Sequence, residues 1–336
     1  MKHEVNLNKY QLRTDLLIDD FNDLNDEIVD VIEKEYKDIK VNITKVKQDN
    51  DIRKKGTYTT ISFEDITDHN NYENVKHILQ EELKNIIKDL NIKDDYKTLV
   101  IGLGNRNSTP DSLGVKVSEN ILVTRYISEL KELSHEYRVV SSFAPNVMGN
   151  TGIEAQSIIK GIIKEVDFDL LIVIDSLASS KIERVNKTIQ ITNTGIYPGS
   201  GVGNHRKEIS QATLGLPVIA LGVPTVVDAT TIVTDTINLL IKKIEYMKNN
   251  NSKEKLKAKD KVNYLKEERI KLNNQERNKL LGLLGELSNE DLKSFISEVL
   301  TPVGYNMMVT PKEIDFIIDK LSFLISQAIN NTIHKI

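Results

Sequence analysis

The spacing of hydrophobic residues in the first third of the chain predicts a helix, a hairpin and a second helix. From Asp19 to Tyr36, apolar residues recur every three or four positions, which is the period of a helix with one buried face. Two alternating stretches, Val41–Val46 and Tyr58–Phe63, flank the charged segment Gln48–Lys55, a pattern typical of a β-hairpin. Tyr72–Leu90 returns to the helical period and predicts an amphipathic helix.

The centre of the chain contains short runs that are almost entirely apolar, as expected for strands buried on both faces. The four runs are Leu99–Leu103, Val139–Ala144, Leu170–Ile174 and Val218–Leu221. Helix-length segments alternate with them, over Ser112–Leu133, Gly152–Val166 and Ala229–Met247. This alternation predicts an α/β fold with a mostly parallel sheet and helices on both faces. Ligand and catalytic groups are then expected beyond the carboxyl ends of the strands.

The last quarter of the chain has a different character. Residues 249–275 are rich in Lys, Glu and Asn and predict a charged linker. Residues 276–336 predict a helical segment in which Ser288 and Thr310 are expected to cap helices. The sequence thus predicts a helix, hairpin and helix over 16–95, an α/β core over 96–248, the linker, and a C-terminal helical extension.

Composition excludes several classes of site. The 336 residues include no cysteine, so disulfides, thiol nucleophiles and thiolate metal sites are excluded. The formal net charge of −4 gives no reason to expect a nucleic-acid partner. We find no apolar stretch of membrane-spanning length and no apolar leader, so we expect a cytoplasmic protein without a membrane partner.

Two aspartates follow predicted core strands. Asp111 lies in the loop after Leu99–Leu103, and Asp175 directly follows Leu170–Ile174. If both strands run parallel, both carboxylates reach the same edge of the sheet, where one can act as a base and the other as an acid. The alternative is that Asp111 caps a helix and Asp175 lies in a turn.

Glycines and basic residues near these aspartates suggest where a substrate binds. Gly199, Gly201 and Gly203 lie in one loop, whose backbone can approach an extended peptide closely. Three cations, Lys181, Arg184 and Arg206, are candidates for orienting an acidic substrate.

Other chemistry is less well supported by the sequence. The GLGN segment at 102–105 lacks the third glycine of a dinucleotide-binding turn, so a nucleotide site rests on weak evidence. Asp111, Asp175 and His205 supply three donors for a metal, but no paired-histidine spacing supports such a site. We therefore expect no cofactor, and a metal stays an alternative.

Long motifs across the chain resemble the germination protease family of spore-forming bacteria. They are YQLRTDLL (10–17), LVIGLGN (99–105), TPDSLG (109–114), VMGNTGIE (147–154), IDSLASSKIERVNKTIQITNTGIYPGSGVGNHRKEIS (174–210), LGLPVIALGVPTVVDA (214–229) and TPVGYNMMVTPKEID (301–315). The resemblance implies a fold like that of the hydrogenase-maturation endopeptidases. It also implies an atypical aspartic endopeptidase whose two aspartates are Asp111 and Asp175.

The same resemblance implies how the protein is made and used. The family's substrates are small acid-soluble spore proteins, whose degradation it starts in the spore core during germination. The family forms homotetramers and is made as a zymogen, which implies a propeptide over 1–15 and self-cleavage between Asp15 and Leu16. Two alternatives stay open: a metal-dependent endopeptidase with the same aspartates as ligands, and a non-catalytic module that binds nucleotides or peptides.

Overall fold

The computed structural model describes residues 29–49, 54–130, 133–199, 206–249, 274–300 and 307–335. The predicted propeptide and its predicted cleavage site, Asp15 and Leu16, lie outside these residues. The chain divides into two compact units. The smaller unit contains Ser180–Ile182 and Val227–Val309, and the larger contains the other described residues.

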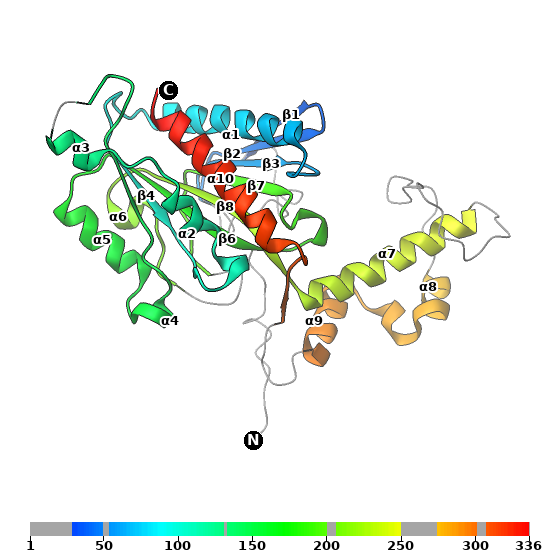
Figure 1. Ribbon diagram of the computed structural model, residues 1–336. Coiled ribbons are helices and arrows are strands. Elements are labelled where there is room, and N and C mark those ends of the chain that lie inside the picture. Colours follow the sequence, from blue (N-terminus) through cyan, green and yellow to red (C-terminus); the bar gives the residue numbers. More distant parts are fainter. Residues whose placement is uncertain are drawn as a thin grey trace. The chain divides into compact units, whose positions relative to one another are not determined.

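One mixed sheet forms the larger unit, in the strand order β1-β2-β3-β7-β8-β6-β4-β5 (Figure 1). Its strands are β1 (Val29–Tyr36), β2 (Ile39–Val46), β3 (Gly56–Ser62), β4 (Thr98–Gly102), β5 (Val140–Phe143), β6 (Leu170–Ser179), β7 (Thr188–Thr192) and β8 (Val218–Asp228). Each run that the sequence predicts as a core strand lies in this sheet, which confirms the α/β class.

The sheet combines parallel and antiparallel parts. β4 pairs parallel with β5 on one side and with β6 on the other. β1, β2, β3, β7 and β8 pair antiparallel in that order. The antiparallel part is larger than the sequence predicts, because the N-terminal hairpin extends the central sheet through the β3–β7 pair.

The helix predicted over Asp19–Tyr36 is wrong for the part that the structure describes. Val29–Tyr36 is the strand β1, paired along its whole length with β2. β1 is an edge strand whose Val31 and Ile32 are 55% and 44% exposed, so its apolar residues form no buried helical face. Cross-strand pairing overrides the local three-to-four spacing here.

Helices cover both faces of the sheet. One face packs against α1 (His69–Asp89), α2 (Leu113–Glu119) and α10 (Ile314–Ile333), which share one hydrophobic core with the strands. The other face packs against α5 (Ala155–Glu165), through a second core. Figure 1 shows α10 crossing the face that also carries α1 and α2. The predicted helices over 72–90 and 152–166 are thereby confirmed.

The helix predicted over Ser112–Leu133 is instead divided. A short 3-10 helix, η3 (Thr109–Asp111), precedes α2, and α3 (Arg125–Leu130) follows it. Thr124 interrupts the helical path, because its hydroxyl accepts the Val140 N–H at 2.9 Å and so ties this segment to β5. Two further short helices, α4 (Met148–Thr151) and α6 (Gln211–Leu214), lie in the loops.

The smaller unit is mostly helical. It contains α7 (Ala229–Asn249), α8 (Asn274–Leu281), η6 (Gly282–Glu286), α9 (Asn289–Leu300) and the two-residue strand β9 (Met308–Val309), which pairs with the end of β8. Ser288 caps α9 as predicted, since its hydroxyl accepts the Asp291 N–H at 3.1 Å. Most of the predicted linker lies outside the described residues.

The second predicted cap is wrong. In the larger unit, α10 begins at Ile314 after Glu313, whereas the Thr310 hydroxyl donates a hydrogen bond to the Thr225 carbonyl at 2.9 Å. Thr310 therefore ties the chain to β8. Among the helices that the structure describes, none is both long enough and apolar enough to span a membrane.

Candidate active site

Asp111 is the last residue of η3, in the loop that follows β4. The Asn105 N–H donates to the Asp111 carboxylate oxygen Oδ2 and to its backbone carbonyl, each at 3.0 Å. Ser112, not Asp111, takes the N-cap position of α2. The helix-capping alternative for Asp111 is therefore wrong, and its carboxylate is held by the preceding loop.

The surroundings of Asp111 favour its neutral form. Burial raises the pKa of this carboxyl from 3.8 to about 6, although the hydrogen bond from Asn105 opposes the rise. Desolvation acts this way because removing water penalises the charged state more than the neutral one. A carboxyl with this pKa can both give and take a proton near neutral pH.

Asp175 lies within β6 and is only 4% exposed. The strand continues through Ser179, so the strand end expected at Ile174 is wrong. The turn alternative for Asp175 is wrong as well, because the residue belongs to the strand. Its Oδ1 accepts the Ser176 N–H at 2.9 Å.

Close backbone packing holds the Asp111 loop against the strand that carries Asp175. The Leu103 N–H donates to the Ile174 carbonyl at 2.8 Å, directly before Asp175. The next residue, Gly104, has φ +109°, and a Cβ on it would lie 2.0 Å from the Asp111 carbonyl oxygen and 3.0 Å from Oδ1. The structure therefore places the Asp111 loop beside the backbone that directly precedes Asp175, beyond the C-terminal end of β4.

Two more glycines complete this packing. A Cβ on Gly114, in the first turn of α2, would lie 2.4 Å from the carbonyl oxygens of both Ile174 and Leu103. A Cβ on Gly102 would lie 2.0 Å from the Gly114 carbonyl oxygen. The glycines of the GLGN segment thus face protein backbone, which leaves their nucleotide-binding interpretation without geometric support.

The glycine loop is described only at its ends. Gly199 has φ +69°, and Gly201, Gly203 and His205 lie outside the described residues. Ile196 and Ile209 form a β-bridge that closes the base of the loop.

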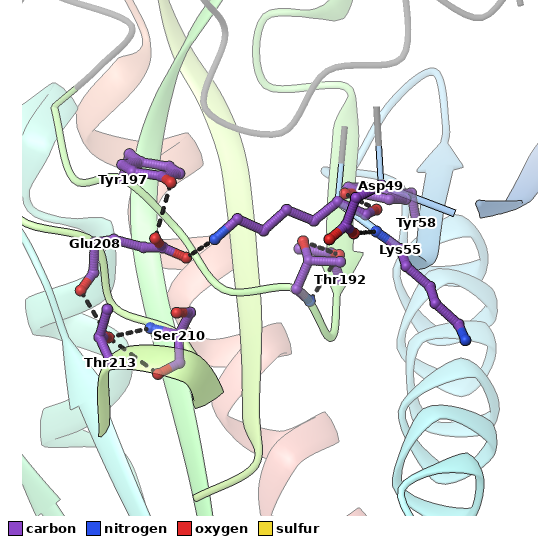
Figure 2. A network of polar contacts seen from close by, with 10 residues as sticks. Asp49, Lys55, Tyr58, Thr192, Tyr197, Glu208, Ser210 and Thr213 are labelled. Carbon is purple, nitrogen blue, oxygen red and sulfur yellow. Dashed lines mark hydrogen bonds and ion pairs between the residues drawn. The ribbon is translucent and has the colours of Figure 1, made fainter. Parts of the chain in front are cut away.

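A polar network anchors the same loop to the end of the hairpin (Figure 2). The Lys54 ammonium pairs with the Glu208 carboxylate, which also accepts a hydrogen bond from the Tyr197 hydroxyl at 2.8 Å. Thr213 donates to the Glu208 carbonyl at 3.0 Å. No motif in the sequence links Lys54 to Glu208, because they lie far apart along the chain.

The three predicted basic residues occupy different places. Arg206 reaches the loop after β5, where its Nη1 lies 2.8 Å from the Met148 sulfur and 3.8 Å from the Glu154 carboxylate. Arg184 ends the short helix η4 (Ile182–Arg184). Lys181 belongs to the smaller unit.

The described residues do not provide a metal-binding set. Nowhere in this part of the chain do three His, Asp or Glu side chains gather as ligands. Asp111 and Asp175 supply two carboxylates, whereas a metal site needs three or four donors. The third predicted donor, His205, lies outside the described residues.

Two carboxylates beside the C-terminal end of β4 can supply an acid and a base, which is the chemistry of a hydrolase. Comparison with known families identifies it more closely: the sequence model described as "Germination protease" matches residues 10–336, and the chain belongs to this family of proteases.

Similar proteins support the assignment over almost the full length. The germination protease of Bacillus subtilis is 42% identical, covering 99% of this chain and 96% of its own. That of Priestia megaterium is 40% identical with the same coverage.

Among solved structures, the NiFe hydrogenase maturation protease HycI of Thermococcus kodakarensis matches 42% of this chain and 80% of its own, at 16% identity and a TM-score of 0.27.

Proposed function

We propose that this protease starts the degradation of small acid-soluble spore proteins during germination, using Asp111 and Asp175 on an attacking water. One observation carries the proposal: the loop of Asp111 packs against the strand of Asp175. The Leu103 N–H donates to the Ile174 carbonyl, directly before Asp175, and Gly104 packs against Asp111. The names of the related proteases support the biological setting.

The raised pKa of Asp111 supports the role of acid for this residue. Asp175 takes a proton from water as its oxygen attacks the peptide carbonyl carbon. Asp111, whose pKa is about 6, gives its proton to the leaving nitrogen as the C–N bond breaks. The products are a carboxylic acid and an amine. Asp175 then releases its proton to solvent and Asp111 takes one up from solvent, so both residues return to their starting states.

Replacing each aspartate tests this pair. Cleavage of a purified small acid-soluble spore protein is measured for Asp111→Asn and Asp175→Asn, with Asp95→Asn as the exposed control. We expect each site variant to lose at least about 100-fold in kcat/KM, the usual contribution of a positioned acid or base. Near-normal turnover by either variant would remove that residue from the mechanism.

The proposal includes a zymogen whose propeptide spans 1–15. Mass spectrometry of the activated protein is expected to find a fragment that ends at Asp15 and a new N-terminus at Leu16. An intact N-terminus under every condition that yields activity would contradict self-processing.

We further propose that the active protein is a homotetramer in the cytoplasm of the spore core. Sedimentation analysis of the activated protein is expected to give four times the mass of one chain. A monomer of full specific activity would contradict this assembly.

A further inference from the structure

A cavity of about 430 Å³ lies at the end of the sheet opposite the Asp111 loop. Two of its lining residues, Tyr96 and Arg138, each lie two residues before a strand, β4 and β5 respectively. These two strands are parallel, so both residues lie at the N-terminal ends of the strands. Asp111 lies in the loop that follows β4. The cavity is therefore separate from the candidate active site.

Three cations line this cavity. Lys84 and Lys88 lie one turn apart on α1, where like charges at this spacing repel each other. Lys84 is also paired with Glu81 at 3.2 Å, in an exposed contact outside the lining. Arg138 adds a third positive charge, and Asp94 is the carboxylate among the described lining residues. Three cations against one carboxylate give the lining a net charge of +2.

Arg138 is held firmly at the cavity wall. Its guanidinium lies over the Tyr96 ring, 4.7 Å from the ring centroid. Its backbone N–H donates to His334 Nδ1 at 3.2 Å, and its carbonyl accepts a hydrogen bond from the Thr124 hydroxyl. The Nε–H of its guanidinium is buried and has no hydrogen-bond partner in the part of the chain that the structure describes. This cation therefore lacks one of the acceptors that a buried charged donor normally has.

The uncharged part of the lining combines polar and apolar groups. Asn91 offers a side-chain amide that can donate a hydrogen bond. Ile87 and Ile92 form an apolar wall and pack against the hydrophobic core behind it. An apolar wall with a few convergent polar groups is typical of sites for small organic ligands.

We propose that this cavity, which we call the Arg138 cavity, binds a dianionic phosphate group, either as inorganic phosphate or as a small organic phosphate monoester. Its net charge of +2 matches two negative charges, and guanidinium and ammonium groups both bind phosphate oxygens. The cations come from α1 and from the segment before β5, so a bound phosphate joins these elements and stabilises the folded protein. This inference does not depend on the proposed protease function.

Isothermal titration calorimetry of the full-length protein at pH 7.5 tests the Arg138 cavity. The two probes are inorganic phosphate and phenyl phosphate, with the ionic strength held constant by sodium chloride. We expect both to bind with a dissociation constant of about 1 mM or below and to raise the thermal unfolding midpoint as their concentration rises. Tighter binding of phenyl phosphate would assign the cavity to a monoester, and equal binding would assign it to the phosphate group alone.

Variants locate the binding within the protein. Lys88→Gln and Arg138→Gln each remove one lining charge, and we expect each to weaken phosphate binding about five- to tenfold. Arg125→Gln is the matched control for Arg138, because Arg125 also lies over an aromatic ring, 5.0 Å from the Phe168 centroid, but outside the lining. Lys160→Gln removes an exposed lysine from α5 and is the control for Lys88. Both controls should bind phosphate as the wild type does.

Three results would overturn the inference. The first is that neither probe gives a heat of binding or moves the unfolding midpoint of the wild type. The second is unchanged phosphate binding by a folded Lys88→Gln variant, whose exposed side chain can be replaced without disturbing the core. The third is an equal loss of binding in the two controls, which would show a general effect of charge and no defined site.

Discussion

Asp111→Asn should make the protein more stable at neutral pH while it removes activity. The structure buries this carboxyl and raises its pKa from 3.8 to about 6, so the folded protein holds an ionised carboxylate at neutral pH at a cost. An asparagine keeps an oxygen that can accept the Asn105 N–H and carries no charge. The substitution therefore removes the cost and keeps the hydrogen bond.

The size of the effect follows from the pKa shift of Asp111. A rise from 3.8 to about 6 corresponds to about 3 kcal/mol, at 1.36 kcal/mol per pKa unit. Between these two values the folded state binds more protons than the unfolded state, so the free energy of unfolding of the wild type falls as pH rises through that window. Below 3.8 the carboxyl is neutral in both states, and the penalty disappears.

Urea unfolding at pH 7.5 and pH 4, at one protein concentration, measures this difference. We expect Asp111→Asn to exceed the wild type by about 1 to 3 kcal/mol at pH 7.5, with the gain much smaller at pH 4. Asp95→Asn, at an exposed site, serves as the control and should show no such change. A variant that is less stable than the wild type at pH 7.5 would refute the burial argument.

Three further predictions follow from the contacts around the site and the core. Gly104→Ala should lower the free energy of unfolding by about 1 to 3 kcal/mol and remove most of the activity, because its Cβ would lie 2.0 Å from the Asp111 carbonyl oxygen. Gly161→Ala, which has open space around it in α5, is the control and should stabilise the protein slightly. Equal effects of the two substitutions would contradict the packing. Asp68→Ala should destabilise by about 1 kcal/mol in urea unfolding, because Asp68 accepts the Asn71 N–H at the start of α1, and an unchanged midpoint would disprove this cap. Dialysis against EDTA should leave spore-protein cleavage unchanged; a loss that one divalent ion restores would favour the ligand role for the aspartates.

Predictions from sequence succeeded where local pattern and tertiary environment agree. The apolar runs at Leu99–Leu103 and Leu170–Ile174 are buried strands, because few other environments accept so many consecutive apolar residues. β1 was missed because its pairing with β2, rather than its own period, decides its conformation. Long-range pairing of this kind is not visible in a single segment.

In the candidate site too, some features are visible in the local sequence, whereas others depend on long-range packing. The sequence makes Asp111 and Asp175 candidates because each follows an apolar run, although Asp175 lies within β6 and not after it. The hydrogen bond from Asn105, the approach of Gly104 to Asp111 and the meeting of Arg206 with Glu154 depend on how separate segments pack. Side chains that carry no motif can be assigned only from that packing.

The close contact between Gly104 and Asp111 affects both the position and the pKa of the Asp111 carboxyl. Gly104 lets the Asp111 backbone approach closely, and this packing helps to exclude the water that would otherwise stabilise the carboxylate. A side chain at position 104 should push the loop outward and admit water. The pKa of Asp111 in Gly104→Ala should then fall from about 6 towards 3.8, as measured by carboxyl carbon NMR titration. An unchanged pKa in a displaced loop would mean that burial by other groups, and not this glycine contact, raises the pKa of Asp111.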